Sequence, residues 1–242
     1  MTLSSIVLIV LFALLASLVQ RVSGFGFGIL MMTMLPHLMP SYAEATALSG
    51  LLALVNSLVT AVLMYRHLEW KKLLPILVTF IIVSFFFVRM VAHVDNHSIK
   101  QALGVFLILA SLYFFFVSGR FRLPPSVPVQ VGMGALSGVL GGLFGMQGPP
   151  AVVYFVGSTD TKEEYIALTQ WYFLIGNAAM TIFRAGNGFV TPVVIKSWLL
   201  AVPAVLAGLW IGTHIYKRIR LPLLRKVVYA YMAFAGLLCI IL

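Results

Sequence analysis

The sequence predicts an all-α polytopic membrane protein built from two inverted repeats of about five membrane-embedded helical segments each. Of its 242 residues, 62% are hydrophobic and only 9% are charged, whereas a soluble domain carries about a quarter charged residues. Apolar runs, several of them near the ~20 residues that a spanning helix needs, follow one another with short gaps. These gaps are too short to hold a soluble catalytic domain. The pattern of runs restarts near the middle of the chain, which indicates two halves.

Five apolar segments make up the first half, which we predict to be an N-terminal transmembrane repeat over residues 1–117. Charged residues, prolines and glycines separate the segments, as is typical of helix boundaries. The first run lacks the basic start of a cleaved signal peptide, so we expect it to be retained. The segments cover residues 3–22, 25–39, 42–65, 73–93 and 99–117.

A proline- and arginine-containing linker, residues 118–128, follows the first half. We expect this linker to be cytoplasmic. The apolar pattern then begins again, which predicts a C-terminal transmembrane repeat over residues 129–242. Its segments cover residues 129–146, 149–157, 163–184, 191–216 and 222–242.

The halves also resemble each other in individual residues. Gly28 and Gly148 are 120 positions apart, and Asn56 and Asn177 are 121 apart. Internal duplication is common in secondary transporters, which bind their substrate near the membrane midplane where the repeats meet. The sequence therefore predicts a central site built from both halves.

Basic residues indicate the orientation of the chain. If the first two segments of each half contribute an even number of crossings, 11 Lys and Arg fall on one side of the membrane and four on the other. If these two segments together make one crossing, seven Lys and Arg fall on one side and eight on the other. The positive-inside rule favours the even scheme. With an odd number of crossings per half, the repeats are inverted and both termini lie outside, in the periplasm.

The stretch RVSGFGFG, residues 21–28, interrupts the apolar pattern after the first segment. Irregular backbone at membrane depth is tolerated only inside protein or beside a wet cavity. The stretch therefore predicts a broken helix or helical hairpin, at which the free N–H groups of the next helix form an anion site. Its candidate substrate-binding residues are Arg21, Ser23, Gly24, Gly26 and Gly28.

The second half repeats this device in GGLFGMQGPP, residues 141–150. A proline suits the first turn of a helix, so a second helix start is expected after Gln147 and Gly148, both candidate substrate-binding residues. Two helix N-termini aimed at one place suit a small, multiply charged anion. For Arg21 the alternatives are pairing with this anion through its planar fork or snorkelling to the lipid headgroups.

The two glycine motifs carry a resemblance to a known family. SGFGFGILMMTMLP (residues 23–36) and GLFGMQGPPAVVYF (residues 142–155), each followed by a helix with a mid-span asparagine, are similar to the TauE/SafE sulfite-exporter family, also called TSUP. The similarity covers essentially the whole chain. It implies an inner-membrane carrier for sulfite, thiosulfate or organosulfonates such as sulfoacetate. Met146 and Gln147 stand where small residues are common in the family, which implies a half-site shaped for a particular ligand.

Two further segments carry polar faces at helical spacing. Asn56 lies on one such face in residues 42–65, and Gln170 and Asn177 lie on another in residues 163–184. We expect these three to line the substrate cavity, with helix packing as the alternative. Arg184 continues the second face, but its position near a predicted helix end favours the membrane interface.

The remaining chemistry predicts a transporter rather than an enzyme. No histidine pair has metal-ligand spacing with acidic partners, so we assign neither a metal nor a cofactor, and no catalytic constellation is visible. The basic residues lie between apolar runs, which indicates a bilayer and not a nucleic acid as partner. An intramembrane enzyme acting on a lipid or phosphate ester, or a non-transporting membrane subunit, are the alternatives. The oligomeric state stays open.

Overall fold

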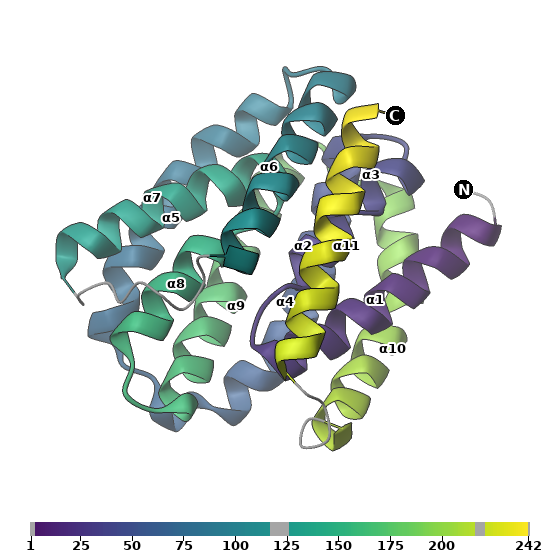
Figure 1. The fold of residues 1–242 in the computed structure, drawn as a ribbon. Helices are drawn as coiled ribbons and strands as arrows, with labels where there is room; N and C mark the ends of the chain where they lie inside the picture. The colour runs from purple at the N-terminus through teal and green to yellow at the C-terminus, as the bar shows by residue number, and fades with distance from the viewer. Residues whose placement is uncertain (1–2, 117–125, 216–220, 242) are drawn as a thin grey trace.

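The computed structural model describes residues 3–116, 126–215 and 221–241, and these form helices without strands (Figure 1). Within them, six helices are long and apolar enough to cross a membrane: α1, α4, α5, α7, α9 and α10. The elements of the first half are α1 (Leu3–Ser23), α2 (Phe27–Met32), α3 (Leu35–Leu38), α4 (Tyr42–Leu63), the 3-10 turn η1 (Tyr65–His67), α5 (Trp70–Val91) and α6 (Asn96–Phe116). Those of the second half are α7 (Val127–Phe144), α8 (Gly148–Ser158), α9 (Lys162–Gly186), α10 (Pro192–Ile215) and α11 (Leu221–Ile241).

The helices follow the predicted segments to within a few residues, with one exception. Residues 25–39 form two short helices instead of one, because the chain turns at Thr33. Thr33 Oγ1 lies 2.7 Å from the carbonyl oxygen of Leu30 and 3.1 Å from the hydroxyl of Tyr231. Most of the expected linker, residues 118–125, lies outside the described residues, so the proposed division into two repeats and a linker stays a prediction.

Hydrogen bonds between helix starts define the two ends of the bundle. At one end, which we call the Glu44 end, Thr191 Oγ1 donates to Glu44 Oε1 at 2.6 Å and the Tyr42 N–H donates to Asn96 Oδ1 at 3.0 Å. These contacts join the starts of α4, α6 and α10. At the other end, the Lys72 end, Lys72 Nζ donates to Glu164 Oε1 at 2.5 Å, which joins the starts of α5 and α9.

The chain makes a hairpin at each glycine motif. The last turn of α1 reaches the Lys72 end, where Arg21 Nε donates to Thr213 Oγ1 at 2.8 Å near the end of α10. The start of α4 lies at the Glu44 end, so α2 and α3 carry the chain back. In the second half, α7 runs toward the Glu44 end and α8 returns to the Lys72 end, next to the start of α9. This arrangement matches the even scheme that the basic residues favour.

The helix pairs keep the same pattern when the two halves are exchanged. Helix α1 packs against α10, α7 against α5, α4 against α9 and α6 against α11. If α1, α4, α5 and α6 are matched in order with α7, α9, α10 and α11, the pair α1–α10 becomes α7–α5, and α4–α9 and α6–α11 each become themselves. Glycines allow these close crossings: a Cβ at Gly208 would lie 2.9 Å from Ser17 Cβ, and one at Gly138 would lie 2.7 Å from Val83 Cβ.

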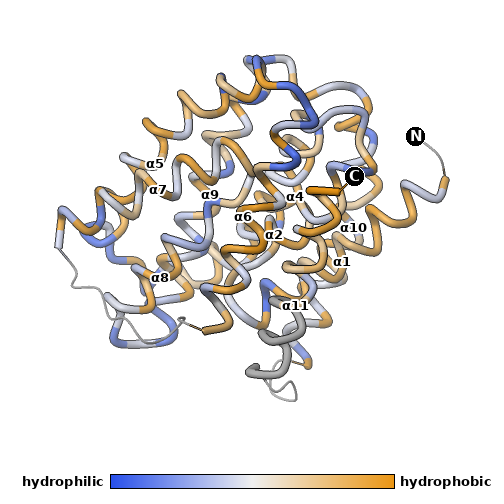
Figure 2. The backbone as a smooth tube through the Cα atoms, turned by 45° about the horizontal axis from the view of Figure 1, so that its top comes forward, coloured by the Kyte–Doolittle hydropathy of each residue, from blue (hydrophilic) through white to orange (hydrophobic). Residues whose placement is uncertain are grey.

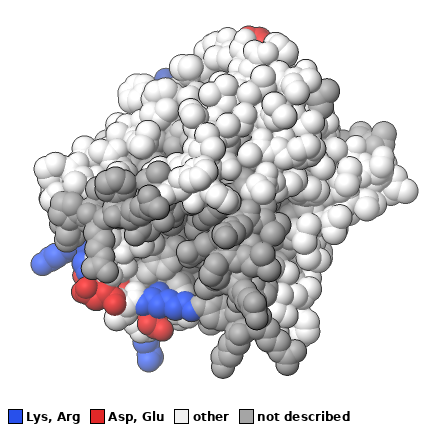
Figure 3. All heavy atoms as spheres, in the orientation of Figure 1, with Lys and Arg blue, Asp and Glu red and all other residues white. Residues whose placement is uncertain are grey.

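Polar residues gather at the ends of the bundle. The helices are mostly hydrophobic along their length, and hydrophilic residues concentrate in the connections between them (Figure 2). On the face shown in Figure 3, most of the visible charged side chains gather at the lower edge, near the ends of α8 and α9 in Figure 1, and the middle of the face has almost none. This distribution is the one expected of a multi-pass membrane protein.

Candidate functional site

The two glycine motifs meet at the centre of the bundle. A Cβ added to Gly28 would lie only 2.7 Å from the carbonyl oxygen of Gly145, so the α1–α2 turn and the α7–α8 turn are in direct contact. The turns depend on backbone that favours glycine, since φ is +87° at Gly24, +105° at Gly26 and +68° at Gly145. Both predicted helix breaks are therefore present, and their tips touch.

A cavity of about 30 Å³ lies at this contact. It is lined by residues from both motifs and from the polar faces of α4 and α9: Gln20, Gly26, Gly28, Ile29, Ala53, Gly145, Met146, Gln147, Gly148, Phe173 and Asn177. A cavity of this size has room for a water molecule. It is too small for a sulfonate group with its sulfur and oxygens.

The N–H groups expected to bind the anion are fewer than the sequence suggested. Helix α2 has only six residues, and its first N–H, that of Phe27, already donates to Gln20 Oε1 at 3.3 Å. Helix α8 has prolines at positions 149 and 150, and proline has no N–H. The helix starts meet as predicted, but in this conformation they surround a nearly closed space and offer few donors.

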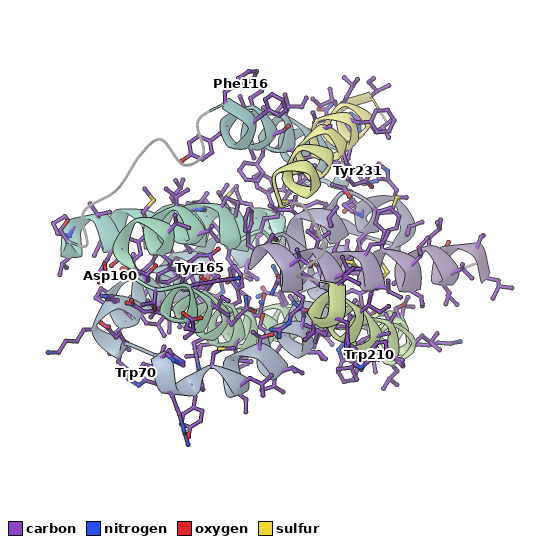
Figure 4. All side chains as sticks on the ribbon, turned by 60° about the horizontal axis from the view of Figure 1, so that its bottom comes forward. Trp70, Phe116, Asp160, Tyr165, Trp210 and Tyr231 are labelled. Carbon is purple, nitrogen blue, oxygen red and sulfur yellow. The ribbon has the colours of Figure 1, made fainter. Side chains whose placement is uncertain are left out.

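A larger cavity of about 330 Å³ lies next to this contact, toward the Lys72 end. Its volume is within the range of ligand pockets. Gln20 lines both cavities. The larger one, which we call the α1–α9 pocket, is lined by Gln20, Arg21, Val22, Ser23, Gly24, Asn56, Thr60, Val156, Thr159, Asp160, Thr161, Lys162, Tyr165, Ile166, Gln170 and Leu209. Asp160, in the loop before α9, and Tyr165, near the start of α9, lie near each other (Figure 4).

Comparison with known proteins decides the family. The sequence model described as "Sulfite exporter TauE/SafE" matches residues 9–239, nearly the full chain. The chain belongs to the TauE/SafE family. It is similar to a protein of Cupriavidus necator named probable sulfite/organosulfonate exporter TauE, with 23% identity over 207 residues that cover 80% of this chain and 77% of the relative. No solved structure matches the chain at a significant level. TauE/SafE is a transporter family, which agrees with the expectation that the chain is not an enzyme.

Side-chain amides form the wall of the α1–α9 pocket in this TauE/SafE protein. Gln20 Nε2 donates to Gln170 Oε1 at 3.2 Å, and Gln170 Nε2 donates to the carbonyl oxygen of Gly24 at 3.0 Å. The α1–α2 turn is thereby fixed to α9. Ser23 Oγ lies 2.7 Å from the carbonyl oxygens of Val19 and Phe25, which holds the same turn from within.

The charges at this pocket favour an anion. Arg21 is half-buried and Lys162 lies at the start of α9, whereas Asp160 is the only acid among the lining residues. The lining thus carries a net positive charge. Arg21 Nε is held by Thr213, which fixes the arginine against the neighbouring helix α10.

The structure divides the predicted site residues between the two cavities. Asn56 lines the α1–α9 pocket, together with Arg21, Ser23, Gly24 and Gln170, whereas Asn177 lines the small cavity. We expected the two asparagines to line one cavity; they lie in neighbouring ones because the touching glycine turns separate them. Both are buried, and Asn56 Nδ2 has no hydrogen-bond partner.

Arg184 corrects a further expectation. Its side chain is only 1% exposed and lies inside the bundle, not at the membrane interface. Nη2 donates to the carbonyl oxygen of Gly141 at 3.1 Å, near the end of α7. The polar face of α9 already contained the signal, because Arg184 continues the series of Gln170 and Asn177; its nearness to the helix end outweighed that pattern. By contrast, Arg89 and Lys196 are exposed, as expected of interfacial residues.

Proposed function

We propose that this protein is a secondary transporter that exports small sulfur-containing anions across the inner membrane. Sulfite, thiosulfate and organosulfonates such as sulfoacetate are the candidate substrates. Family membership and the named relative support this class of substrate. The observation that carries the proposal is the α1–α9 pocket, whose volume of about 330 Å³ and positively charged lining suit such an anion.

The substrate-binding residues that we propose act at two stages. In the α1–α9 pocket the anion is bound by Gln20, Arg21, Ser23, Gly24, Asn56 and Gln170. When the two glycine turns move apart and the small cavity opens, the anion contacts a second set of residues: Gly26, Gly28, Gln147, Gly148 and Asn177. Buried polar contacts of this kind, made at a repeat interface, are typical of transporters that expose a central site alternately to either side.

The proposed orientation places the Lys72 end in the cytoplasm and both termini in the periplasm. The 11-to-four distribution of basic residues in the even scheme supports it. The exchange of helix partners between the halves supports two inverted repeats. In this orientation the α1–α9 pocket lies toward the cytoplasm, where an exporter takes up its substrate.

Transport by the purified protein in liposomes tests the proposal. A thermal-shift screen with sulfite, thiosulfate, sulfoacetate, taurine, sulfate and acetate first selects the ligand. Efflux of that ligand is then measured in vesicles with and without protein. We expect stabilisation and efflux with at least one sulfur-containing anion and weaker effects with acetate. If none of the sulfur-containing anions binds or moves, the proposed function is wrong.

A further inference from the structure

A line of polar side chains runs along α9 past the contact of the glycine turns. Gln170 lines the α1–α9 pocket, Asn177 lines the small cavity, and Arg184 follows at the same spacing of seven residues. Seven residues are about two helical turns, so these side chains share one face at intervals of about 10 Å. We call these three residues the α9 track.

Helix α4 faces this track with small or polar residues. Asn56 lies at the level of the α1–α9 pocket and Ala53 at the level of the small cavity. Gly50 lies opposite Arg184, where a Cβ would come within 2.5 Å of Nη1. The glycine thus leaves the space that the guanidinium fills. The track and its facing residues continue beyond the glycine contact, toward the Glu44 end.

Arg184 is a buried cation without an anionic partner. None of the ion pairs found among the described residues includes it, and both Nε and Nη1 lack any hydrogen-bond partner. Glu44, the buried acid of the facing helix α4, is bonded elsewhere, since Thr191 donates to Oε1 and Ser41 Oγ lies 3.1 Å from Oε2. Only Nη2 has partners, the carbonyl oxygen of Gly141 and, at 3.8 Å, Met180 Sδ.

A charge buried in this way is strongly unfavourable unless a partner arrives. The unpaired Nε and Nη1 lie on either side of the bonded Nη2, and each can donate a charge-assisted hydrogen bond to an oxygen of a sulfonate or sulfite. We infer that Arg184 is a second anion-binding position, which receives the transported anion on the Glu44 side of the glycine contact. This inference rests on the proposed function and adds the residue that binds substrate in the exit half of the path.

A structural role makes a different prediction. If Arg184 only caps the carbonyls at the end of α7, removing it lowers thermal stability and the amount of folded protein. Transport per folded molecule then stays the same for every anion. A substrate-binding role instead changes the ratio of transport rates for a dianion and a monoanion, because the missing charge affects the dianion more.

The test compares efflux of sulfoacetate, a dianion, with that of methanesulfonate, a monoanion, in liposomes that contain equal amounts of folded protein. For Arg184→Gln we expect sulfoacetate efflux to fall at least tenfold and the ratio of the two rates to fall at least threefold. Arg184→Lys should recover part of both, since it keeps the charge and loses the fork. Arg89→Gln is the matched control, because Arg89 lies in the last turn of α5 and is exposed; it should behave as wild type.

An unchanged rate ratio in Arg184→Gln overturns the inference. If that variant does not fold, Gly50→Ala decides, because its methyl group would displace the guanidinium and leave the charge in place. We expect sulfoacetate efflux to fall several-fold in Gly50→Ala and to be unchanged in Gly132→Ala, whose added methyl group meets nothing within 4 Å. Equal efflux in these two variants also overturns the inference. Absence of efflux in the wild type would instead contradict the proposed function.

Discussion

The contact between the two glycine turns makes Gly28 a sensitive position for transport. In Gly28→Ala the new Cβ would lie 2.7 Å from the carbonyl oxygen of Gly145. The opposing atom belongs to the backbone at the tip of the α7–α8 hairpin and has no side-chain freedom with which to yield. We therefore expect the substitution to force the two turns apart.

The size of this effect follows from packing. Overpacking of a well-packed contact costs about 1–3 kcal/mol. The helix-propensity gain of alanine over glycine, about 1 kcal/mol, applies whether or not the turns touch, so it does not change the balance between these two states. The population of the state with touching turns should thus fall by a factor of roughly 5–150 relative to the separated state.

Anion efflux from liposomes measures the consequence. A transporter that alternates between the two states needs both, so efflux per folded molecule should fall at least fivefold in Gly28→Ala. Gly132→Ala is the control for the added methyl group, because Gly132 also lies in a helix and its Cβ would meet nothing within 4 Å. Efflux in Gly28→Ala within twofold of this control would refute the reasoning that the touching turns are a transport state.

The other predictions concern the pocket and the orientation. Arg21→Gln should weaken sulfoacetate binding about ten- to a hundredfold in calorimetry, the size of a lost charge-assisted hydrogen bond, and Arg21→Lys should recover part of it; full affinity in Arg21→Gln would assign Arg21 to snorkelling. Asn56→Leu and Asn177→Leu should each abolish efflux while the folded protein stays extractable, and normal efflux in both would assign these residues to helix packing. In a cysteine-free background, Lys71→Cys should react with an impermeant thiol reagent only from the cytoplasm and Lys196→Cys only from the periplasm, and the reverse pattern would contradict the proposed orientation.

Hydropathy predicted most of the fold because each apolar segment is limited by local residues. Helix α8 begins at Gly148 with Pro149 and Pro150 in its first turn, and α5 and α10 each end within a few residues of the predicted boundary. The break within residues 25–39 was not predicted. Thr33 contacts Tyr231, which is 198 positions away, and a contact this distant leaves no local pattern in the sequence.

The site was predicted in part for a similar reason. Spacing placed Gln170 and Asn177 on one face of a helix, and the structure agrees. Spacing does not reveal how closely two turns from different halves approach. The contact between Gly28 and Gly145 therefore divided the expected single site into two cavities. The spacing also does not reveal the burial of Arg184, which depends on the position of Gly50 on the facing helix.

The buried acids show how fold and driving force are connected. Glu44 and Glu164 are each 8% exposed, and each N–H bonds to the capping residue three positions earlier, Ser41 or Thr161. This capping pattern occurs twice, 120 residues apart and at opposite ends of the bundle. Both carboxylates are thus bonded at helix starts. The acid that lines the α1–α9 pocket, Asp160, is exposed in the loop before α9. Among the described residues, the α9 track therefore carries positive charge without a neighbouring carboxylate to carry a proton. An anion on such a path is driven outward by an inside-negative potential, by about 2.3 kcal/mol per charge per 100 mV, which supports the export direction that we propose.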